Sequence, residues 1–139
     1  MNFTAANIAF WKNYVKFEGR SSRSEFWWCS FAHTVMFIFI AVALLAYMSS
    51  AVDLATGELS GVAYGLWMTF FFGYFLVTLL PWMSLTVRRF HDQDKSGWMW
   101  LINLVFGLIV LIFMCIEGTR GPNKYGEDPL GRSNPDIFD

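Results

Sequence analysis

Hydrophobic positions in this 139-residue chain gather into three runs that contain no Asp, Glu, Lys or Arg. The runs cover residues 26–50, 63–87 and 98–116, which are 25, 25 and 19 residues long. A helix needs roughly 20 apolar residues to cross a membrane. Three such runs fill half the chain and leave too little polar sequence to cover them as core helices. The pattern therefore predicts three transmembrane helices, over 22–50, 63–87 and 98–116.

The segment before the first run predicts an amphipathic helix that lies in the membrane interface. At 100° per residue, one half of the wheel over residues 3–17 is apolar and aromatic, and two lysines fall on the other half. Gly19 is expected to cap this helix at its C-terminus. Ser22 and Glu25 have the spacing of a capping box, so the first crossing helix is expected to begin near Arg23.

The remaining segments predict connections within one membrane domain, residues 1–139. Residues 1–21 form the interfacial helix and an elbow. Residues 117–139 form a tail whose density of Gly and Pro predicts turns. Asn123 and Tyr125 among these turns suggest an ordered cap. The predicted fold class is an all-α integral membrane protein with an interfacial helix, three transmembrane helices and an irregular tail.

Composition agrees with a membrane protein. The chain is 55% hydrophobic and 15% charged, whereas soluble domains average about 25% charged residues. This argues against a disordered chain and against a soluble domain. The net charge of −1 gives no overall attraction to nucleic acid, and none is expected as a partner. Trp and Tyr lie near the ends of the runs, as expected at the headgroup level.

The basic residues predict the orientation. Four precede the first run, none lies between the first two runs, three lie between the second and third, and three follow the third. Basic residues in short loops stay in the cytoplasm, so the N-terminus and the second loop are expected inside. Three crossings place the tail outside, against its own basic residues. A re-entrant or kinked third segment, with Gly107 near its middle, is the alternative that returns the tail to the cytoplasm.

Polar and small residues inside the runs are candidates for function and packing. His33 and Asn103 lie within the first and third runs, where they line a polar path or form hydrogen bonds between helices. Gly61, Gly65, Thr69 and Gly73 are small residues at every fourth position of the second run. Such a stripe lets another helix approach closely, whether from the same chain or from another copy. Three helices of this size make a thin bundle, which favours a homo-oligomer.

The remaining candidates gather at the predicted cytoplasmic face, where cations and aromatics suggest binding of membrane lipids or a partner protein. The residues are Arg20, Arg23, Glu25, Arg88, Arg89, His91, Asp92 and Trp98. Arg88 and Arg89 are expected to face headgroups. The spacing of His91, Asp92 and Asp94 matches no strong metal signature, so neither a metal nor a cofactor is expected.

Three separated motifs carry a resemblance to a known family. They are Gly19-Arg20 with Arg23 and Glu25-Phe26-Trp27; Arg88-Arg89 with His91-Asp92 and Lys95-Ser96-Gly97-Trp98; and Gly118-Thr119 with Gly121, Asn123, Tyr125-Gly126 and Asp128-Pro129. In this order they resemble the domain-of-unknown-function 805 family over nearly the whole chain. The resemblance implies a bacterial inner-membrane protein and brings no assigned activity. Members commonly carry a Pro in the middle of the third run, and residues 103–107 contain none.

Three functions compete. The favoured one is a non-catalytic, homo-oligomeric, multi-pass module with a cytoplasmic N-terminus, which binds anionic lipid or a membrane protein partner at its cytoplasmic face. The alternative is a channel or small-molecule or ion transporter with a polar path near His33 and Asn103. A membrane enzyme using Glu25, His91, Asp92 and Asp94 is the third, but no spacing names a reaction. The protein is therefore not expected to be an enzyme.

Overall fold

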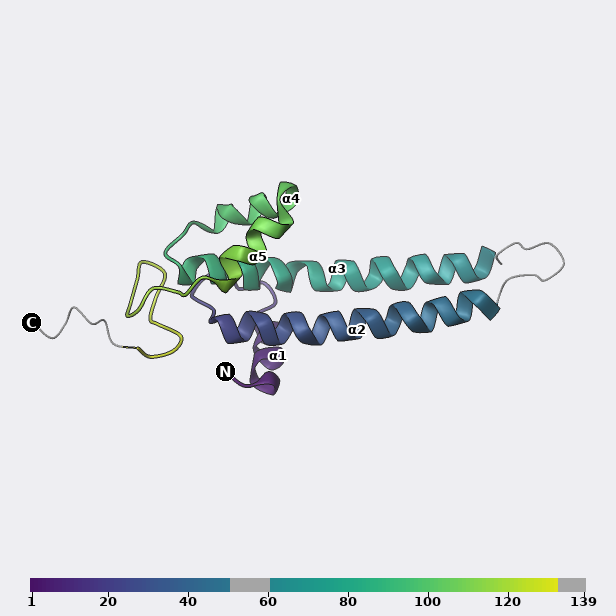
Figure 1. Cartoon of the computed structure of the whole chain (residues 1–139), viewed down its shortest axis with the longest axis horizontal. Helices are drawn as coiled ribbons and strands as arrows, with labels where there is room; N and C mark the ends of the chain where they lie inside the picture. Colours follow the sequence, from purple (N-terminus) through teal and green to yellow (C-terminus); the bar gives the residue numbers. More distant parts are fainter. Residues whose placement is uncertain (51–60, 133–139) are drawn as a thin grey trace, which may run out of the picture. The chain divides into compact units, whose positions relative to one another are not determined.

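The computed structural model describes residues 1–50 and 61–132, apart from the side chains of residues 50, 103 and 104. The helices are α1 (Phe3–Lys12), α2 (Arg23–Ser50), α3 (Gly61–Asp92), the 3-10 helix η1 (Gly97–Leu101), α4 (Ile102–Val105) and α5 (Gly107–Cys115) (Figure 1). Across these ranges the chain forms no strand, and one isolated bridge joins Asn123 to Gly126. The predicted all-α class is thus confirmed for the described residues.

Two of the described helices are long and apolar enough to cross a membrane, over Arg23–Ser49 and Gly61–Asp92. They coincide with the first two predicted spans. Ser22 accepts a hydrogen bond from the Glu25 amide at 3.3 Å, so α2 begins where the capping box predicts. The third predicted span has no counterpart of this length in the described chain.

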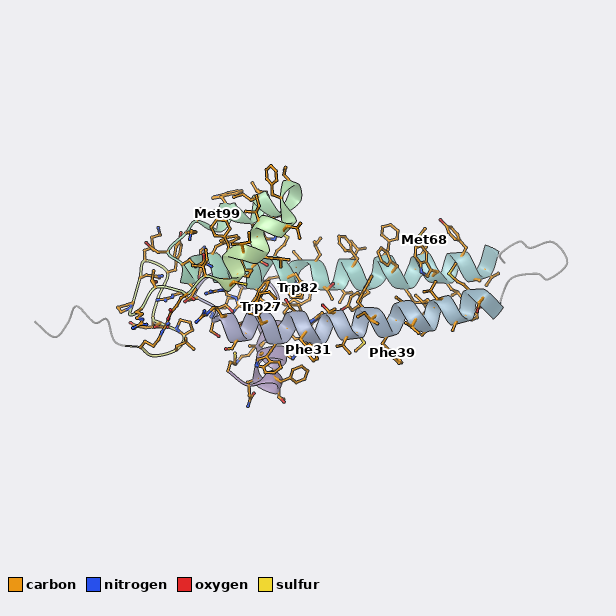
Figure 2. The ribbon with its side chains drawn as sticks, in the orientation of Figure 1. Trp27, Phe31, Phe39, Met68, Trp82 and Met99 are labelled. Carbon is orange, nitrogen blue, oxygen red and sulfur yellow. The ribbon has the colours of Figure 1, made fainter. Side chains whose placement is uncertain are left out.

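Residues 31–79 form one compact unit, the second unit, in which α2 and α3 run side by side. Phe37 and Phe71 pack between them with ring centroids 6.2 Å apart. Many other apolar side chains point outward, and Phe39 in Figure 2 is 70% exposed. A pair of helices with this much exposed apolar surface suits hydrocarbon rather than water.

Residues 1–30 and the chain from residue 80 form the first unit, which holds the protein's main core. Trp82 packs edge-on against Phe10 of α1 and Phe26 of α2, with centroids 5.4 and 5.9 Å away. The core is completed by side chains from all five α-helices but α4: Ala6, Phe10, Phe26, Cys29, Leu85, Phe90, Val110 and Met114. The core therefore joins the N-terminal helix to the end of α3 and to α5.

The third run is not one helix, which corrects the prediction of a single span over 98–116. It forms η1, α4 and α5, and the chain breaks at Phe106, where φ is −133° and ψ is 58°. The longest piece, α5, has 9 residues, or about 14 Å at 1.5 Å per residue. That is too short to cross a bilayer. Val110 and Met114 of α5 are buried in the core, and Phe113 of α5 packs against Phe90 of α3 with ring centroids 6.0 Å apart.

The N-terminal helix is shorter than expected. It ends at Lys12, and Asn13 is its C-cap, so Gly19 is not the capping residue. Gly19 does adopt a positive φ of 85°, in the elbow before α2. Ala6 and Phe10 are buried while Ile8 and Trp11 are exposed. Apolar side chains thus occupy both the packed and the exposed faces of α1.

Candidate functional site

A buried ion pair between Arg20 and Asp92 lies at the centre of the first unit. Arg20 belongs to the elbow before α2, and Asp92 is the last residue of α3. The Arg20 Nη2 lies 2.9 Å from Asp92 Oδ1, and the two side chains are 1% and 3% exposed. Arg20 Nε donates to the same oxygen at 3.0 Å. Two segments 72 residues apart are therefore joined by a charge-assisted contact away from water.

Arg20 also binds the C-terminal tail, residues 117–139. Its Nη1 donates to the carbonyls of Gly121 at 2.6 Å and Gly126 at 3.3 Å. Its Nη2 donates to the Thr119 carbonyl at 2.5 Å. A guanidinium has five N–H donors in a fixed plane, and here they serve one carboxylate and three carbonyls. One arginine thus fixes the path of residues 119–126.

Arg89 approaches Asp92 from within α3. Its Nη1 donates to Asp92 Oδ2, and its Nη2 donates to the Ile116 carbonyl. The Asp92 carbonyl accepts from the Thr119 amide at 2.8 Å and from its hydroxyl at 3.1 Å. One carboxylate is therefore shared by two buried guanidiniums. We call Arg20, Arg89, Asp92 and the tail groups they bind the tail lock.

Gly118 is required by the closeness of this contact. A Cβ on Gly118 would lie 2.8 Å from Asp92 Oδ1 and closer still to Oδ2. Real side chains do not approach so closely, so only glycine lets the tail pass the carboxylate. Gly118 and Thr119 belong to the third sequence motif, but the sequence did not predict them as site residues.

A second ion pair joins the start of α2 to α3. Arg88 Nη1 donates to Glu25 Oε1 at 3.1 Å, and the two side chains are 5% and 7% exposed. Within the described residues, Arg88 Nε and Nη2 have no hydrogen-bond partner. This pair is therefore buried but poorly satisfied, unlike the pair of Arg20 and Asp92.

His91 of α3 makes a second set of contacts with the tail, through Asn123 and Tyr125. Asn123 Nδ2 donates to the His91 carbonyl at 2.9 Å and to the Thr119 hydroxyl at 2.9 Å. The His91 and Tyr125 rings stack with centroids 3.8 Å apart and planes 6° apart. His91 Nδ1 lies 3.2 Å from the Gly19 carbonyl, to which it donates. The tail is thus an ordered cap over its described residues, 117–132, as Asn123 and Tyr125 suggested.

Further along, Asp128 and Arg132 close the described tail. Arg132 Nε donates to Asp128 Oδ2 at 2.8 Å, and Leu130 N donates to Oδ1 at 2.9 Å. Burial alone raises the pKa of the Asp128 carboxyl, but these hydrogen bonds outweigh it and hold the pKa below its ordinary value. The carboxylate form is therefore the one that the fold stabilises.

The predicted cytoplasmic-face residues differ in burial. Arg20, Glu25, Arg88, Arg89 and Asp92 are buried together against protein partners, so Arg88 and Arg89 do not face headgroups. His91 is half-buried. Arg23 and Trp98 are exposed, and Trp98 is 79% exposed at the start of η1. Arg23 Nη1 donates to the Cys115 carbonyl at 3.4 Å.

The predicted residues inside the runs make none of the ion pairs described above within the described residues. His33 is half-buried in the second unit, with its ring centroid 6.4 Å from that of Tyr74. Asn103 lies in α4, and its side chain is outside the described residues. The four predicted stripe residues of α3, Gly61, Gly65, Thr69 and Gly73, are exposed, and a Cβ on Gly61, Gly65 or Gly73 would meet nothing within 4 Å. In the described ranges no group of three or more His, Cys, Asp or Glu could hold a metal ion.

Comparison with known proteins gives the family. Residues 14–127 match the family model described as "Protein of unknown function (DUF805)". The chain belongs to the DUF805 family. This confirms the resemblance, and the matched range contains the tail lock from Arg20 to Gly126. No solved structure matches the chain significantly.

Curated relatives of this DUF805 chain are membrane proteins. It is 36% identical over 126 residues to inner membrane protein YhaI of Escherichia coli strain K12, covering 88% of this chain and 93% of YhaI. It is 34% identical over 121 residues to inner membrane protein YhaH of the same strain, covering 85% of this chain and 90% of YhaH. The two names support a bacterial inner-membrane location and state no activity.

Proposed function

We propose that this DUF805 protein is a non-catalytic membrane module that binds anionic lipid at its cytoplasmic face through α1 and the segment after it. The observation that carries the proposal is the exposed side of this segment. Ile8, Trp11 and Val15 are 62%, 47% and 63% exposed, and the exposed Lys12 and Lys16 lie among them. Apolar side chains beside lysines are the arrangement of a segment lying on an anionic leaflet.

A topology with two crossings and a cytoplasmic tail supports this proposal. Arg20 of the elbow binds tail carbonyls, so the N-terminal segment and the tail share one side if α2 and α3 each cross once. All ten Lys and Arg then lie on that side, because residues 51–62 between the spans contain none. The positive-inside rule makes this side cytoplasmic. The basic residues of the tail, which argue against a third crossing, agree with this two-crossing topology.

The lipid contacts in this proposal differ from those that the sequence favours. Arg20, Arg88 and Arg89 are buried against protein partners, so a headgroup does not reach their guanidiniums. Lys12, Lys16 and the exposed Arg23 remain. A lysine near an anionic surface contributes about 1 kcal/mol, so three such cations suffice for measurable lipid enrichment but not for tight binding.

The test is the lipid composition retained by protein purified from mixed zwitterionic and anionic membranes. The Lys12→Glu/Lys16→Glu variant is expected to lose anionic enrichment by roughly tenfold or more, at about 1 kcal/mol per lysine. The matched control, Arg120→Glu/Lys124→Glu, makes the same change of charge on the exposed tail. An equal loss in both variants, or none in either, contradicts the proposal. Retained lipid with loss of a co-purifying protein favours a partner protein instead.

Homo-oligomerisation is a second proposal, supported by the stripe on α3. The stripe residues are exposed and have open space in front of the Gly positions, so α2 does not use them. Close helix approach through such a stripe predicts that Gly65→Leu/Gly73→Leu weakens self-association in nanodiscs. Val62→Leu, at a 70% exposed neighbouring position, is the control. Unchanged association in the double variant counts against the stripe.

The channel alternative has less support. His33 packs beside Tyr74 within the second unit, which is the geometry of a contact between helices. The side chain of Asn103 lies outside the described residues. Proteoliposome flux that depends on His33 would be needed to restore this alternative.

A further inference from the structure

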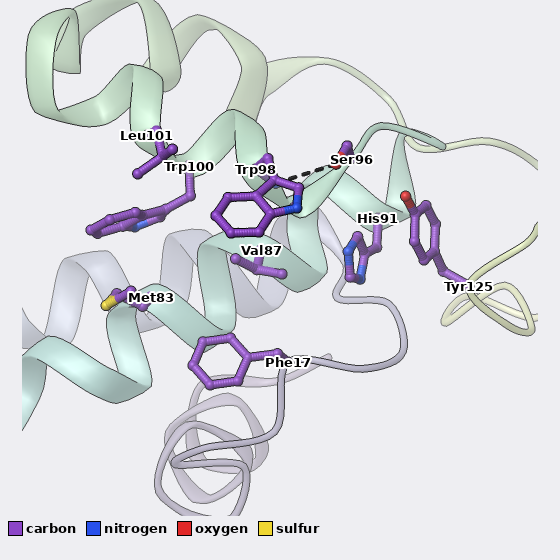
Figure 3. A pocket seen from close by; sticks show the side chains of 10 residues that line it. Phe17, Met83, Val87, His91, Ser96, Trp98, Trp100, Leu101 and Tyr125 are labelled. Carbon is purple, nitrogen blue, oxygen red and sulfur yellow. Dashed lines mark hydrogen bonds between the residues drawn. The ribbon is translucent and has the colours of Figure 1, made fainter.

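A cavity of about 510 Å³ lies within the first unit, between α3, η1, the elbow and the tail (Figure 3). Half of its ten lining residues are aromatic: Phe17, His91, Trp98, Trp100 and Tyr125. We call it the aromatic pocket. Its volume falls within the range of small-molecule sites, about 300–1,000 Å³. It is separate from the tail lock, and the lipid-binding proposal does not use it.

The lining of the aromatic pocket carries no charged side chain. Its polar side chains are His91, Ser96 and Tyr125. Ser96 Oγ already accepts a hydrogen bond from the Trp98 amide at 3.4 Å, the dashed line in Figure 3. Without a lining cation, the pocket does not suit a phosphate headgroup or a fatty-acid carboxylate. An uncharged molecule is the better match.

His91 presents a hydrogen-bond acceptor at the edge of the pocket. The Gly19 carbonyl only accepts hydrogen bonds, so Nδ1, at 3.2 Å from it, carries the proton. In the neutral ring Nε2 is then an acceptor. Tyr125 covers one face of the imidazole, so a ligand meets the ring at its edge. A Cβ built on Gly97, which also lines the pocket, lies 3.1 Å from Nε2, so this atom adjoins the lining.

The position of the pocket points to a ligand that is dissolved in the membrane. Val87 and Met83 belong to α3, one of the two helices apolar enough to cross a bilayer. Trp98 is 79% exposed on η1, as expected for a ring at the level of the headgroups. Aromatic walls favour a flat ring, because offset and edge-to-face ring contacts add to apolar burial. A saturated acyl chain gains nothing from these ring contacts or from Nε2.

We propose that the aromatic pocket binds a flat, uncharged, membrane-dissolved molecule whose ring hydroxyl donates to His91 Nε2, the chemistry of a lipid phenol or quinol. The inference goes beyond the proposed lipid surface and concerns binding alone. It predicts that the hydroxyl, the ring and the acceptor each contribute separately to affinity.

The experiment uses the full chain in nanodiscs, with empty nanodiscs as the baseline for partitioning. The probe is β-naphthol, and the matched ligand is its methyl ether, which has the same ring and no donor. We expect β-naphthol to bind about fivefold more tightly, the ratio that one net hydrogen bond provides. Equal affinities for the two probes would overturn the role of Nε2.

Two conservative variants test the acceptor without emptying the pocket. His91→Asn retains a donor near the position of Nδ1 and loses the atom at Nε2, so it is expected to bind both probes equally. His91→Gln offers an amide oxygen near Nε2 and is expected to restore part of the preference. A preference unchanged in His91→Asn would refute the assignment of Nε2.

Filling the pocket tests its location. Val87→Phe adds a ring to the lining and is expected to weaken both probes at least tenfold. Ile112→Phe makes a comparable change at a 65% exposed position of α5 and is expected to leave both unchanged. Equal weakening in the two variants, or none in Val87→Phe, places the probes elsewhere in the membrane. Thermal unfolding of each variant shows whether it is folded. If Val87→Phe does not fold, the His91→Asn and His91→Gln variants still decide the proposal.

Discussion

The tail passes α3 so closely at Gly118 that one added methyl group is predicted to release it. The position is buried, and its Cβ would overlap the Asp92 carboxylate. Gly118 is not among the glycines with positive φ, so alanine introduces no backbone strain there. The whole effect of Gly118→Ala is therefore expected from displacement of the carboxylate.

The magnitude follows from what the carboxylate holds. Moving it breaks its pairs with Arg20 and Arg89, both buried, and an uncompensated buried charge costs about 3–5 kcal/mol. The tail is held by hydrogen bonds worth about 1 kcal/mol each. If the tail detaches, water reaches both guanidiniums, and the cost of the unpaired charges is replaced by the cost of the lost tail hydrogen bonds, which is of similar size. We therefore expect local opening of the tail rather than global unfolding.

Limited trypsin digestion measures this opening, because Arg120 and Lys124 lie within the tail. A loss of 3 kcal/mol corresponds to more than a hundredfold faster cleavage when opening is fast, at about 1.4 kcal/mol per tenfold. Gly61→Ala, which meets nothing within 4 Å, is the control. In the Asp92→Ala background, the methyl group added by Gly118→Ala no longer meets a carboxylate. The Gly118→Ala/Asp92→Ala variant should therefore be cleaved no faster than Asp92→Ala alone. Additive costs, or wild-type cleavage of Gly118→Ala, would refute the steric reasoning.

Two further predictions follow from the tail and its ion pairs. A C-terminal fusion to a reporter active only in the cytoplasm is expected to be active, whereas a silent reporter would support a third crossing. Because the folded-state pKa of Asp128 lies below its ordinary value, its carboxylate stabilises the tail above about pH 4, and this contribution is lost as the pH falls through the folded-state pKa. Tail cleavage by an acid protease should therefore rise more steeply with acid in wild type than in Asp128→Asn, and parallel profiles would contradict it.

The two long helices could be predicted from sequence because their causes are local. An uncharged run of 25 residues and the capping spacing at Ser22 are both visible without any tertiary contact. The break at Phe106 is different, because an apolar run of 19 residues has the same composition whether it crosses or folds back. Nothing between Asn103 and Gly107 is a proline, so the usual local signal is missing. The break is compensated by burial of Val110 and Met114 against α3, which no local pattern records.

The arginines illustrate the same limit. Arginines at the ends of apolar runs usually face headgroups, so position alone predicts that Arg88 and Arg89 face headgroups and that Arg20 binds lipid or a partner. Arg20 is buried because a tail that begins about a hundred residues later in the chain binds it, and Arg88 is buried against Glu25 at the start of α2. The sequence did contain a signal of these ion pairs. Glu25 and Asp92 supply carboxylates in the same motifs as the arginines, and a basic patch that faces lipid does not require carboxylates.

The buried pairs Arg20–Asp92 and Arg88–Glu25 are expected to respond in opposite ways to apolar replacement. Arg20 cannot be replaced without loss, because it serves three tail carbonyls besides Asp92.

In the part of the chain that the structure describes, the Arg88–Glu25 pair has one hydrogen bond, and two other nitrogens of Arg88 are buried without partners. Replacing a poorly satisfied buried pair by apolar residues is often neutral or stabilising, whereas removing one partner costs about 3–5 kcal/mol. Glu25→Leu alone should therefore destabilise the protein, and adding Arg88→Met should restore wild-type unfolding in detergent. If the double variant is as unstable as the single one, Arg88 contributes interactions beyond this pair.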